Sequence, residues 1–377
     1  MGDEGAGPKA IDVTPARLSR LVAALPATVP FVAPETIERR TGRRFRARLG
    51  ANESAFGISP RAASAMADAL QEASRYGDPE CWDLRQAIAS REGVSTAEVA
   101  VASGIDDLQG LVVRAFLDPG EVAVMSLGAY PTFAYHVVGA GGRTHGVPYR
   151  GDRNDLDALV TAAQRTGARL VFLANPDNPT GSWVGAAELA RFLDALPAGT
   201  LLVLDEAYLE FAPSDRLALE PADLRLVRLR TFSKAYGMAG LRIGYAIAEG
   251  GMVAAFDRIR LHFGVNRVAQ VGARASLADG PFLEGVVRAV AEGRRAYEHL
   301  ARELGLGVVT SAANFVCFDL GRRERAARVL KGLLDRDIFT RTPGAPPLDR
   351  LVRVTVGKAA ERALFEEALR TTLRELG

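Results

Sequence analysis

The sequence predicts an α/β fold, with a large domain built on a mostly parallel sheet covered by helices and a smaller α+β domain on its C-terminal side. Short runs such as Leu201–Leu204 are apolar at every position, and strands of this kind are buried on both faces, as in parallel sheets between helices. Helical stretches alternate with such runs as far as about Arg267, which is typical of α/β domains. Beyond Arg267, long helical stretches give way to shorter strand-like runs, so a second domain of α+β type is expected.

The predicted strands are short apolar runs bounded by loop-forming residues. In the large domain they are Val99–Ala102, Glu121–Met125, Arg169–Ala174, Leu201–Leu204, Leu226–Leu229 and Ile243–Ala248. Ser59 followed by Pro60 predicts a helix start, because serine caps free N–H groups and proline suits the first turn. In the small domain we expect strands over Gly307–Thr310, Phe315–Phe318 and Leu351–Val356, and helices over Phe282–Leu304, Glu324–Arg336 and Ala360–Leu376.

The length of 377 residues suits two domains, at about 150 residues per domain. We expect an N-terminal arm and entry segment over residues 1–45, a large domain over residues 46–267 and a small C-terminal domain over residues 268–377. A chain of this length can bury a substantial core without disulfides or metals.

Composition and charge argue against several classes of protein. The net charge is +2 and no basic run resembles a nucleic-acid footprint, so no nucleic-acid partner is expected. No apolar stretch approaches about 18 residues and there is no signal peptide, so we expect neither a membrane span nor secretion. The two cysteines, Cys81 and Cys317, belong to no C-x-x-C motif, which suits a reducing cytoplasm. The four histidines lack any i, i+4 pair, so no metal is expected.

A group of polar and charged residues stands at the ends of the predicted strands and in the adjoining loops. The group consists of Asn178, Asp205, Tyr208, Ser233, Lys234 and Arg242, with Tyr130 and the helix start after Gly104 further upstream. In α/β sheets, ligands bind at the carboxyl ends of the strands. We therefore expect these residues to form one site.

The residue types of this group match the parts of pyridoxal phosphate. A lysine amine forms a Schiff base with an aldehyde, and Asp205, which follows four apolar residues, can balance a pyridinium nitrogen in a buried place. Asn178 and Tyr208 can donate hydrogen bonds to one oxygen, and Tyr130 can stack on a flat ring. Arginine, serine and the backbone N–H groups of a helix start can surround a phosphate.

With these motifs the sequence resembles the fold-type-I pyridoxal-phosphate aminotransferases, and within that group the histidinol-phosphate aminotransferases. The resemblance runs from about residue 30 to the end of the chain. The motifs that carry it are Asn178-Pro179-Thr180-Gly181, Asp205-Glu206-Ala207-Tyr208, Ser233-Lys234 and Gly240–Tyr245, with Asn52-Glu53, Tyr76, Tyr130 and Leu351–Gly357.

The resemblance implies a fold and a set of cofactor contacts. It implies a mostly parallel seven-stranded sheet in the large domain and a covalent Schiff base between Lys234 and pyridoxal 5′-phosphate. Asp205 then pairs with the pyridine nitrogen, and Tyr208 and Asn178 contact the phenolic oxygen while Tyr130 stacks on the ring. The phosphate is held by Ser233, Arg242 and the backbone amides of Ile105 and Asp106, with Thr231 as a weaker candidate.

The resemblance also implies substrate contacts and a subunit partner. Arg353 matches the arginine that binds the substrate α-carboxylate, which suits a bidentate guanidinium group. Arg341 and Asn52 are the further substrate-binding candidates. Tyr76 matches a tyrosine that reaches the phosphate of the neighbouring subunit's cofactor, so the active unit is expected to be a homodimer.

The expected reaction is a ping-pong transfer of an amino group in the cytoplasm. The donor is histidinol phosphate or an aromatic amino acid, and the acceptor is a keto acid such as 2-oxoglutarate. A free lysine has a pKa of about 10.4. Burial and the cationic cofactor are expected to lower the pKa of Lys234, so that its amine acts as a base near neutral pH.

Two departures from the family pattern leave alternatives open. Gly104-Ile105-Asp106-Asp107 replaces a glycine-serine-aspartate-glutamate pattern, and Phe31 stands where these enzymes often have a tyrosine near the substrate phosphate. An aromatic or broad-range aminotransferase, or a pyridoxal-phosphate decarboxylase or lyase, therefore remains an alternative. A nicotinamide-dependent oxidoreductase is disfavoured because no G-x-G-x-x-G follows a strand. A cofactor-sensing regulator is disfavoured because no DNA-binding module precedes residue 30.

Overall fold

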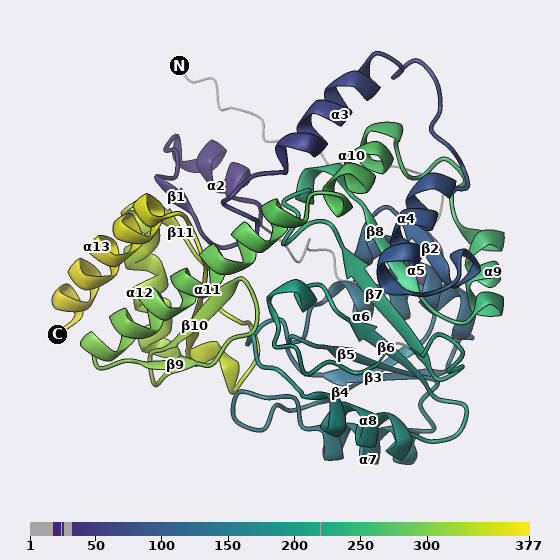
Figure 1. The fold of residues 1–377 in the computed structure, drawn as a ribbon. Coiled ribbons are helices and arrows are strands. Elements are labelled where there is room, and N and C mark those ends of the chain that lie inside the picture. The colour runs from purple at the N-terminus through teal and green to yellow at the C-terminus, as the bar shows by residue number, and fades with distance from the viewer. Residues whose placement is uncertain (1–17, 24, 26–31, 219) are drawn as a thin grey trace, which may run out of the picture.

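The computed structural model describes residues 18–23, 25, 32–218 and 220–377 (Figure 1). A large α/β unit and a smaller α+β unit lie side by side, and the C-terminal helix belongs to the smaller one. The expectation about Phe31 lies outside the described residues. The boundaries at residues 45 and 267 stay a prediction.

The large unit is built on a seven-stranded, mostly parallel sheet, as predicted. The strand order is β2-β8-β7-β6-β5-β3-β4. The bounds are β2 Val99–Ala102, β3 Val122–Ser126, β4 Arg143–Val147, β5 Leu170–Ala174, β6 Leu201–Asp205, β7 Leu226–Thr231 and β8 Gly244–Ile247. The ladders from β4 to β7 are parallel, and β8 runs antiparallel to both β2 and β7. Except in β4, each strand is buried at every position, as expected for a sheet covered on both faces.

Within the seven-stranded sheet, the edge strand β4 is the strand that the sequence pattern did not predict. Its sequence Arg-Thr-His-Gly-Val contains no apolar run, and its first three residues are exposed. An edge strand needs backbone pairing on one side only, and β4 obtains it from β3. Pairing to the sheet, rather than burial of its side chains, therefore makes this segment a strand.

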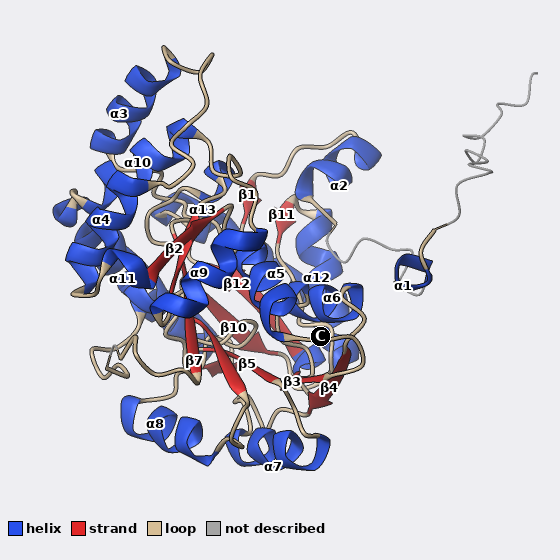
Figure 2. Cartoon of the chain, turned by 90° about the vertical axis from the view of Figure 1, so that its right-hand side faces the viewer, coloured by secondary structure: helices blue, strands red, loops and turns tan. Residues whose placement is uncertain are grey.

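Helices cover both faces of the sheet (Figure 2). Side chains of α5 (Ile105–Phe116), α6 (Thr132–Gly139) and α9 (Gly250–Ile259) pack on one face, against alternate residues such as Leu170 and Phe172. Side chains of α7 (Leu156–Thr166) and α8 (Ala186–Ala195) pack on the other face, against residues such as Val171 and Leu173. This alternation follows from the two-residue period of a strand.

The smaller unit contains a three-stranded antiparallel sheet with the order β12-β10-β9. Its elements are α11 Gly280–Glu303, β9 Gly307–Val309, β10 Phe315–Asp319, α12 Arg323–Asp335, β11 Ile338–Phe339, β12 Leu351–Thr355 and α13 Ala359–Leu376. The rings of Tyr297, Phe318 and Phe365 form its aromatic core, with centroids 5.4 to 5.8 Å apart. Strand β1 (Ala47–Arg48) pairs with β11. The chain is therefore attached to the smaller unit just before the loop that contains Asn52.

The remaining elements connect these layers. They are α1 Arg20–Ala23, α2 Pro34–Thr41, α3 Pro60–Leu70, α4 Trp82–Glu92, α10 Arg267–Leu277 and the short 3₁₀ turns Thr96–Glu98, Leu209–Phe211, Ala239–Leu241 and Leu348–Arg350. The predicted cap is confirmed, because the Ser59 hydroxyl accepts hydrogen bonds from the backbone N–H groups of Arg61 and Ala62. No helix within the described part of the chain is both long and apolar enough to cross a membrane.

Candidate active site

A cavity of about 640 Å³ lies where β6 and β7 end. The structure brings all the predicted site residues except Tyr76 to its wall. These are Asn52, Ile105, Asp106, Tyr130, Asn178, Asp205, Tyr208, Ser233, Lys234, Arg242, Arg341 and Arg353, and the weaker candidate Thr231 lines it too. The walls come from both units, because Arg341 and Arg353 belong to the smaller one.

Lys234 is positioned by the buried end of β7 and by a tight loop. Phe232 is fully buried, and the Ser233 backbone N–H donates to the Thr231 hydroxyl at 3.0 Å. The loop then needs a glycine at Gly237, where φ is +72° and a Cβ would lie 1.9 Å from the Gly57 carbonyl oxygen. Burial, and then the nearby Arg353 guanidinium, lower the pKa of Lys234 to about 8. This confirms the expected direction and makes the amine a base close to neutral pH.

Asp205 is the last residue of β6 and is only 6% exposed. Its Oδ1 accepts a hydrogen bond from the Ala207 backbone N–H at 3.0 Å, and its Oδ2 accepts one from Gln109 Nε2 at 3.3 Å. Burial raises the pKa of Asp205 to about 7, although the Ala207 N–H and Lys234 favour the charged form. A carboxylate with so few donors in an apolar place is suited to a cationic partner.

The Tyr208 ring lies beside the lysine, with Nζ of Lys234 5.6 Å from the ring centroid. Its hydroxyl accepts a hydrogen bond from Asn52 Nδ2 at 3.0 Å, which leaves the phenolic proton for another acceptor. Burial raises the pKa of Tyr208 to about 12, so the phenol keeps this proton at neutral pH. Asn52 is fixed in turn by Thr355 of β12, whose hydroxyl accepts a hydrogen bond from the Asn52 backbone N–H at 3.0 Å.

Arg353 lies on the cavity wall with its guanidinium 5.3 Å from the centroid of the Phe315 ring. Its Nη1 donates to Asn178 Oδ1 at 2.6 Å, and its Nη2 donates to the Gly50 carbonyl at 3.1 Å. Its buried Nε has no hydrogen-bond partner within the described part of the chain. The backbones of Arg341 and Arg353 are bridged, and burial together with the Arg353 charge lowers the pKa of Arg341. Two arginines therefore stand side by side, which favours an anionic ligand.

The N-terminus of α5 forms another wall of the cavity. Gly104 precedes this helix with φ +89°, and a Cβ there would lie 2.6 Å from Arg242 Nη2. The absence of a side chain lets the guanidinium approach the helix start, where it also lies 3.5 Å from Asp106 Oδ2. The hydroxyls of Thr231 and Ser233 are 3.0 Å apart and open on the same cavity. Backbone N–H groups, hydroxyls and a guanidinium are the groups that bind phosphate.

Two predicted aromatic residues have different surroundings. Tyr130 follows β3 and lines the cavity, and burial raises the pKa of its hydroxyl to about 12. Tyr76 does not line it: the side chain is 77% exposed and its ring centroid lies 4.5 Å from that of Phe263. The chain on its own therefore does not place Tyr76 at this site.

Sequence reasoning missed two residues of the site. Glu53 lines the cavity and favours the charged form of Lys234, and it was visible only as the neighbour of Asn52 in the loop motif. Gln109 contacts Asp205 from the middle of α5. The available signal was a polar residue one helical turn after Ile105, among the apolar residues of that helix.

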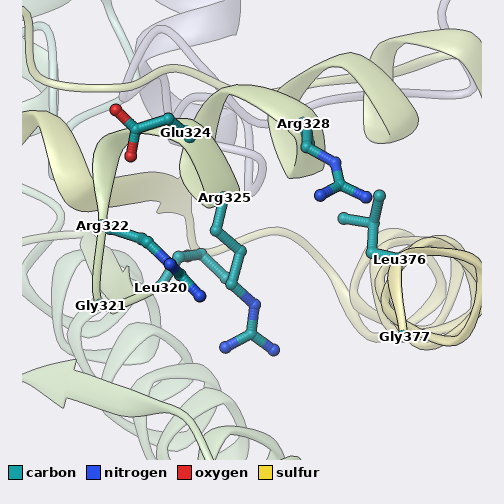
Figure 3. A pocket seen from close by; sticks show the side chains of 8 residues that line it. All are labelled: Leu320, Gly321, Arg322, Glu324, Arg325, Arg328, Leu376 and Gly377. Atoms are coloured by element: carbon teal, nitrogen blue, oxygen red, sulfur yellow. The ribbon is translucent and has the colours of Figure 1, made fainter.

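A hollow of about 890 Å³ lies elsewhere, against the start of α12 and the end of α13 (Figure 3). The side chains of Arg322, Arg325 and Arg328 line it together with Leu376 at the end of α13. It contains no lysine that could form a Schiff base and no buried carboxylate. Among the described residues, no group of three or more histidine, cysteine, aspartate or glutamate side chains is arranged to hold a metal. The chemistry therefore points to the cavity of Lys234 and Asp205.

Comparisons with known proteins agree with this geometry. The family model "Aminotransferase class I and II" matches residues 47–370. Histidinol-phosphate aminotransferase 2 of Carboxydothermus hydrogenoformans is 35% identical over 354 residues, which cover 92% of this chain and 97% of that protein. Histidinol-phosphate aminotransferase 2 of Pseudomonas fluorescens Pf0-1 is 38% identical over 330 residues, covering 86% of this chain and 88% of that protein.

A solved structure has the same fold over nearly the whole chain. It is the histidinol-phosphate aminotransferase of Sinorhizobium meliloti in complex with pyridoxal 5′-phosphate, with a TM-score of 0.92 and 45% identity. The match covers 96% of this chain and 99% of that chain. The chain therefore belongs to the class I and II aminotransferases and is a pyridoxal-phosphate-dependent transaminase of fold type I.

Proposed function

We propose that this transaminase uses histidinol phosphate as its amino donor and a keto acid such as 2-oxoglutarate as its acceptor. The cofactor is held as a Schiff base on Lys234. The observation that carries the assignment of the site is that a lysine with a lowered pKa and a buried carboxylate open on one cavity. The choice of donor is supported by the names of the relatives, which are histidinol-phosphate aminotransferases at 35% and 38% identity.

The residues present fit pyridoxal phosphate. The glycine at position 104 keeps a side chain out of the helix start. Arg242 and the hydroxyls of Thr231 and Ser233 can therefore donate hydrogen bonds to a phosphate bound there. Asp205 has one backbone and one amide donor, and no described residue is a cationic partner in direct contact with it; a pyridinium nitrogen would supply that partner. The cavity of about 640 Å³ is within the usual size range of ligand sites.

The bound cofactor supplies an electron sink that lowers the cost of removing a proton from the substrate Cα. Asp205 keeps the ring nitrogen protonated, because its carboxylate is otherwise poorly balanced. Tyr208 would donate its hydroxyl proton in a hydrogen bond to the phenolic oxygen of the cofactor, because the Tyr208 oxygen already accepts a hydrogen bond from Asn52. The Lys234 amine would hold or move the proton at the substrate Cα, and its lowered pKa suits that role near neutral pH.

The arginine pair provides the anion site for both substrates. Histidinol phosphate carries a phosphate where an amino acid has its anionic end, and the acceptor carries a carboxylate. Guanidinium groups bind both anions in forked geometry. Arg353 lines the cavity, and the hydrogen bonds of its Nη1 and Nη2 to Asn178 and Gly50 hold its guanidinium at the proposed anion site.

Steady-state assays with 2-oxoglutarate as acceptor test the choice of donor. Histidinol phosphate and phenylalanine are compared as donors at equal enzyme concentration. We expect kcat/KM for histidinol phosphate to exceed that for phenylalanine by about tenfold or more, because its dianionic phosphate pairs with the two guanidinium groups more strongly than a carboxylate does. A higher value for phenylalanine would assign the enzyme to the aromatic aminotransferases instead.

A homodimer is part of the proposal. Tyr76 and Phe263 are 77% and 54% exposed and contact each other, and Leu261, two residues before Phe263 in the sequence, is 78% exposed. Exposed apolar side chains that lie together mark surfaces for a partner. In the proposed dimer, Tyr76 completes the phosphate site of the second subunit. Sedimentation equilibrium on the holoenzyme should give twice the chain mass, and a monomer that is fully active would contradict this role.

The proposed place of action is the cytoplasm. Cys81 and Cys317 are both buried free thiols, as expected for a protein that works under reducing conditions. Burial raises the pKa of the Cys81 thiol to about 11, which makes it unreactive.

A further inference from the structure

Gln109 is a buried polar residue that the fold does not require. It lies in α5 between Leu108 and Gly110, and none of its surface is exposed. Leu108, Leu111 and Val112 around it are also fully buried. Its Nε2 donates to Asp205 Oδ2 at 3.3 Å, and its buried Oε1 has no hydrogen-bond partner among the residues that the structure describes. A leucine would fill a similar volume without an unsatisfied oxygen, so packing alone does not explain an amide here.

The position of Gln109 connects it to both ends of the cofactor cavity. Residues four apart lie on the same face of a helix, and Gln109 lies four residues after Ile105, which lines the cavity at the helix start. The same helix therefore contributes the proposed phosphate amides and the hydrogen bond to Asp205. Without Gln109, the N–H of Ala207 would be the one donor left to the Asp205 carboxylate among the described residues.

An amide can serve the carboxyl group in both of its protonation states. In the structure its nitrogen faces Asp205, which suits the ionised form. After a half-turn of the amide, the oxygen Oε1 would accept the proton of a neutral Asp205 carboxyl. Neither leucine nor arginine could do both.

We propose that Gln109 is a positioning residue, which holds the Asp205 carboxylate ionised and directed at the ring nitrogen of pyridoxal phosphate. The inference rests on the proposed role of Asp205. Gln109 acts on the cofactor through Asp205, and it does not contact the substrate.

The holoenzyme of Gln109→Leu tests this role. We expect the dissociation constant of pyridoxal phosphate to rise about tenfold, the effect of losing one hydrogen bond to a charged group. The pH midpoint of the visible absorbance of the bound cofactor should move by about half a unit or more. The value of kcat should fall while KM for the amino donor stays unchanged, because Gln109 lies outside the substrate contacts.

Two further variants separate positioning from packing. Thr372→Val is the matched control: Thr372 is 2% exposed and its Oγ1 also lacks a partner, but it lies in α13, outside the cavity. It should leave both cofactor readouts unchanged. Gln109→Glu keeps the shape and adds a second acid, so cofactor binding should weaken as the pH rises and recover at acidic pH. This variant decides the question if Gln109→Leu fails to fold.

The outcomes distinguish this inference from the function on which it rests. If Gln109→Leu and Gln109→Glu both bind the cofactor with wild-type affinity and midpoint, the inference is overturned. An equal shift in Thr372→Val would overturn it too, because any loss of a buried oxygen would then produce the effect. If Asp205→Asn leaves the cofactor spectrum unchanged, it is the proposed role of Asp205 that fails.

Discussion

The two ends of the cofactor cavity use charge in different ways. Asp205 is 6% exposed, receives two hydrogen bonds and has a pKa raised to about 7 by burial. At the helix start of α5, Arg242 and Asp106 lie 3.5 Å apart with side chains 48% and 42% exposed. A charge in a buried place has a large effect on protonation, whereas exposed ion pairs are screened by water and salt. In the proposed function, the buried end would therefore control the chemistry, and the exposed end would mainly position the phosphate.

The largest expected effect is at the buried end. Asp205→Asn should lower the rate of transamination by roughly 10³-fold, because the ring nitrogen loses the charge that keeps it protonated. The variant should still bind some cofactor through Lys234 and the phosphate contacts. Single-turnover absorbance measurements with the amino donor provide the readout. A variant with wild-type turnover would show that the carboxylate is dispensable.

The stability of the cofactor-free protein should also report on Asp205. Its folded pKa is raised from 3.8 to about 7, so its contribution to stability is fully present below about pH 4 and is lost as the pH rises through about 7. Asparagine does not titrate. The difference in unfolding free energy between Asp205→Asn and the wild type should therefore change by roughly 2 to 3 kcal/mol in favour of the variant when the pH is raised from 5 to 8.

Urea unfolding at the two pH values measures this difference. Asp83→Asn is the control, because that side chain is 70% exposed and pairs only with the exposed Arg274. Its difference from the wild type should stay constant between the two pH values. A constant difference for Asp205→Asn as well would mean that Asp205 is not held in a place that disfavours its charge.

The smallest effect is expected at the exposed end. Arg242→Gln should weaken binding of pyridoxal phosphate by about tenfold at low salt, and the difference from wild type should shrink as salt is added. Arg322→Gln, in the arginine-lined hollow of Figure 3, is the matched control and should not change binding. The loss of transamination rate caused by Asp205→Asn should persist as salt is added. If salt affected both site variants equally, the contrast between the two ends would be wrong.

The sequence predicted those parts of the fold in which local pattern and burial agree. Strands such as Leu201–Asp205 are apolar at nearly every position, and their ends placed Asp205 and Lys234 at one cavity. Strand β4 was missed because an edge strand with exposed side chains is determined by pairing with β3. The pattern of a segment does not record such a partner.

Contacts between segments that are far apart in the sequence could not be predicted from local patterns either. The hydrogen bond from Asn52 to Tyr208 joins residues 156 positions apart, and the one from Gln109 to Asp205 joins residues 96 apart. Motif resemblance placed Asn52 and Tyr208 at the site but gave no reason to select Gln109. Tyr76 shows the reverse case: resemblance selected it, and in a single chain it lies outside the cavity, so the role proposed for it requires a second subunit.

Borohydride reduction of the holoenzyme, followed by peptide mapping, tests the assignment of Lys234 most directly. The chain has only three other lysines, Lys9, Lys331 and Lys358, so the modified position can be identified without ambiguity. We predict one reduced pyridoxyl adduct, on the peptide that contains Lys234, and none in Lys234→Ala. An adduct on another lysine, or an alanine variant that is reduced and active like the wild type, would contradict the account.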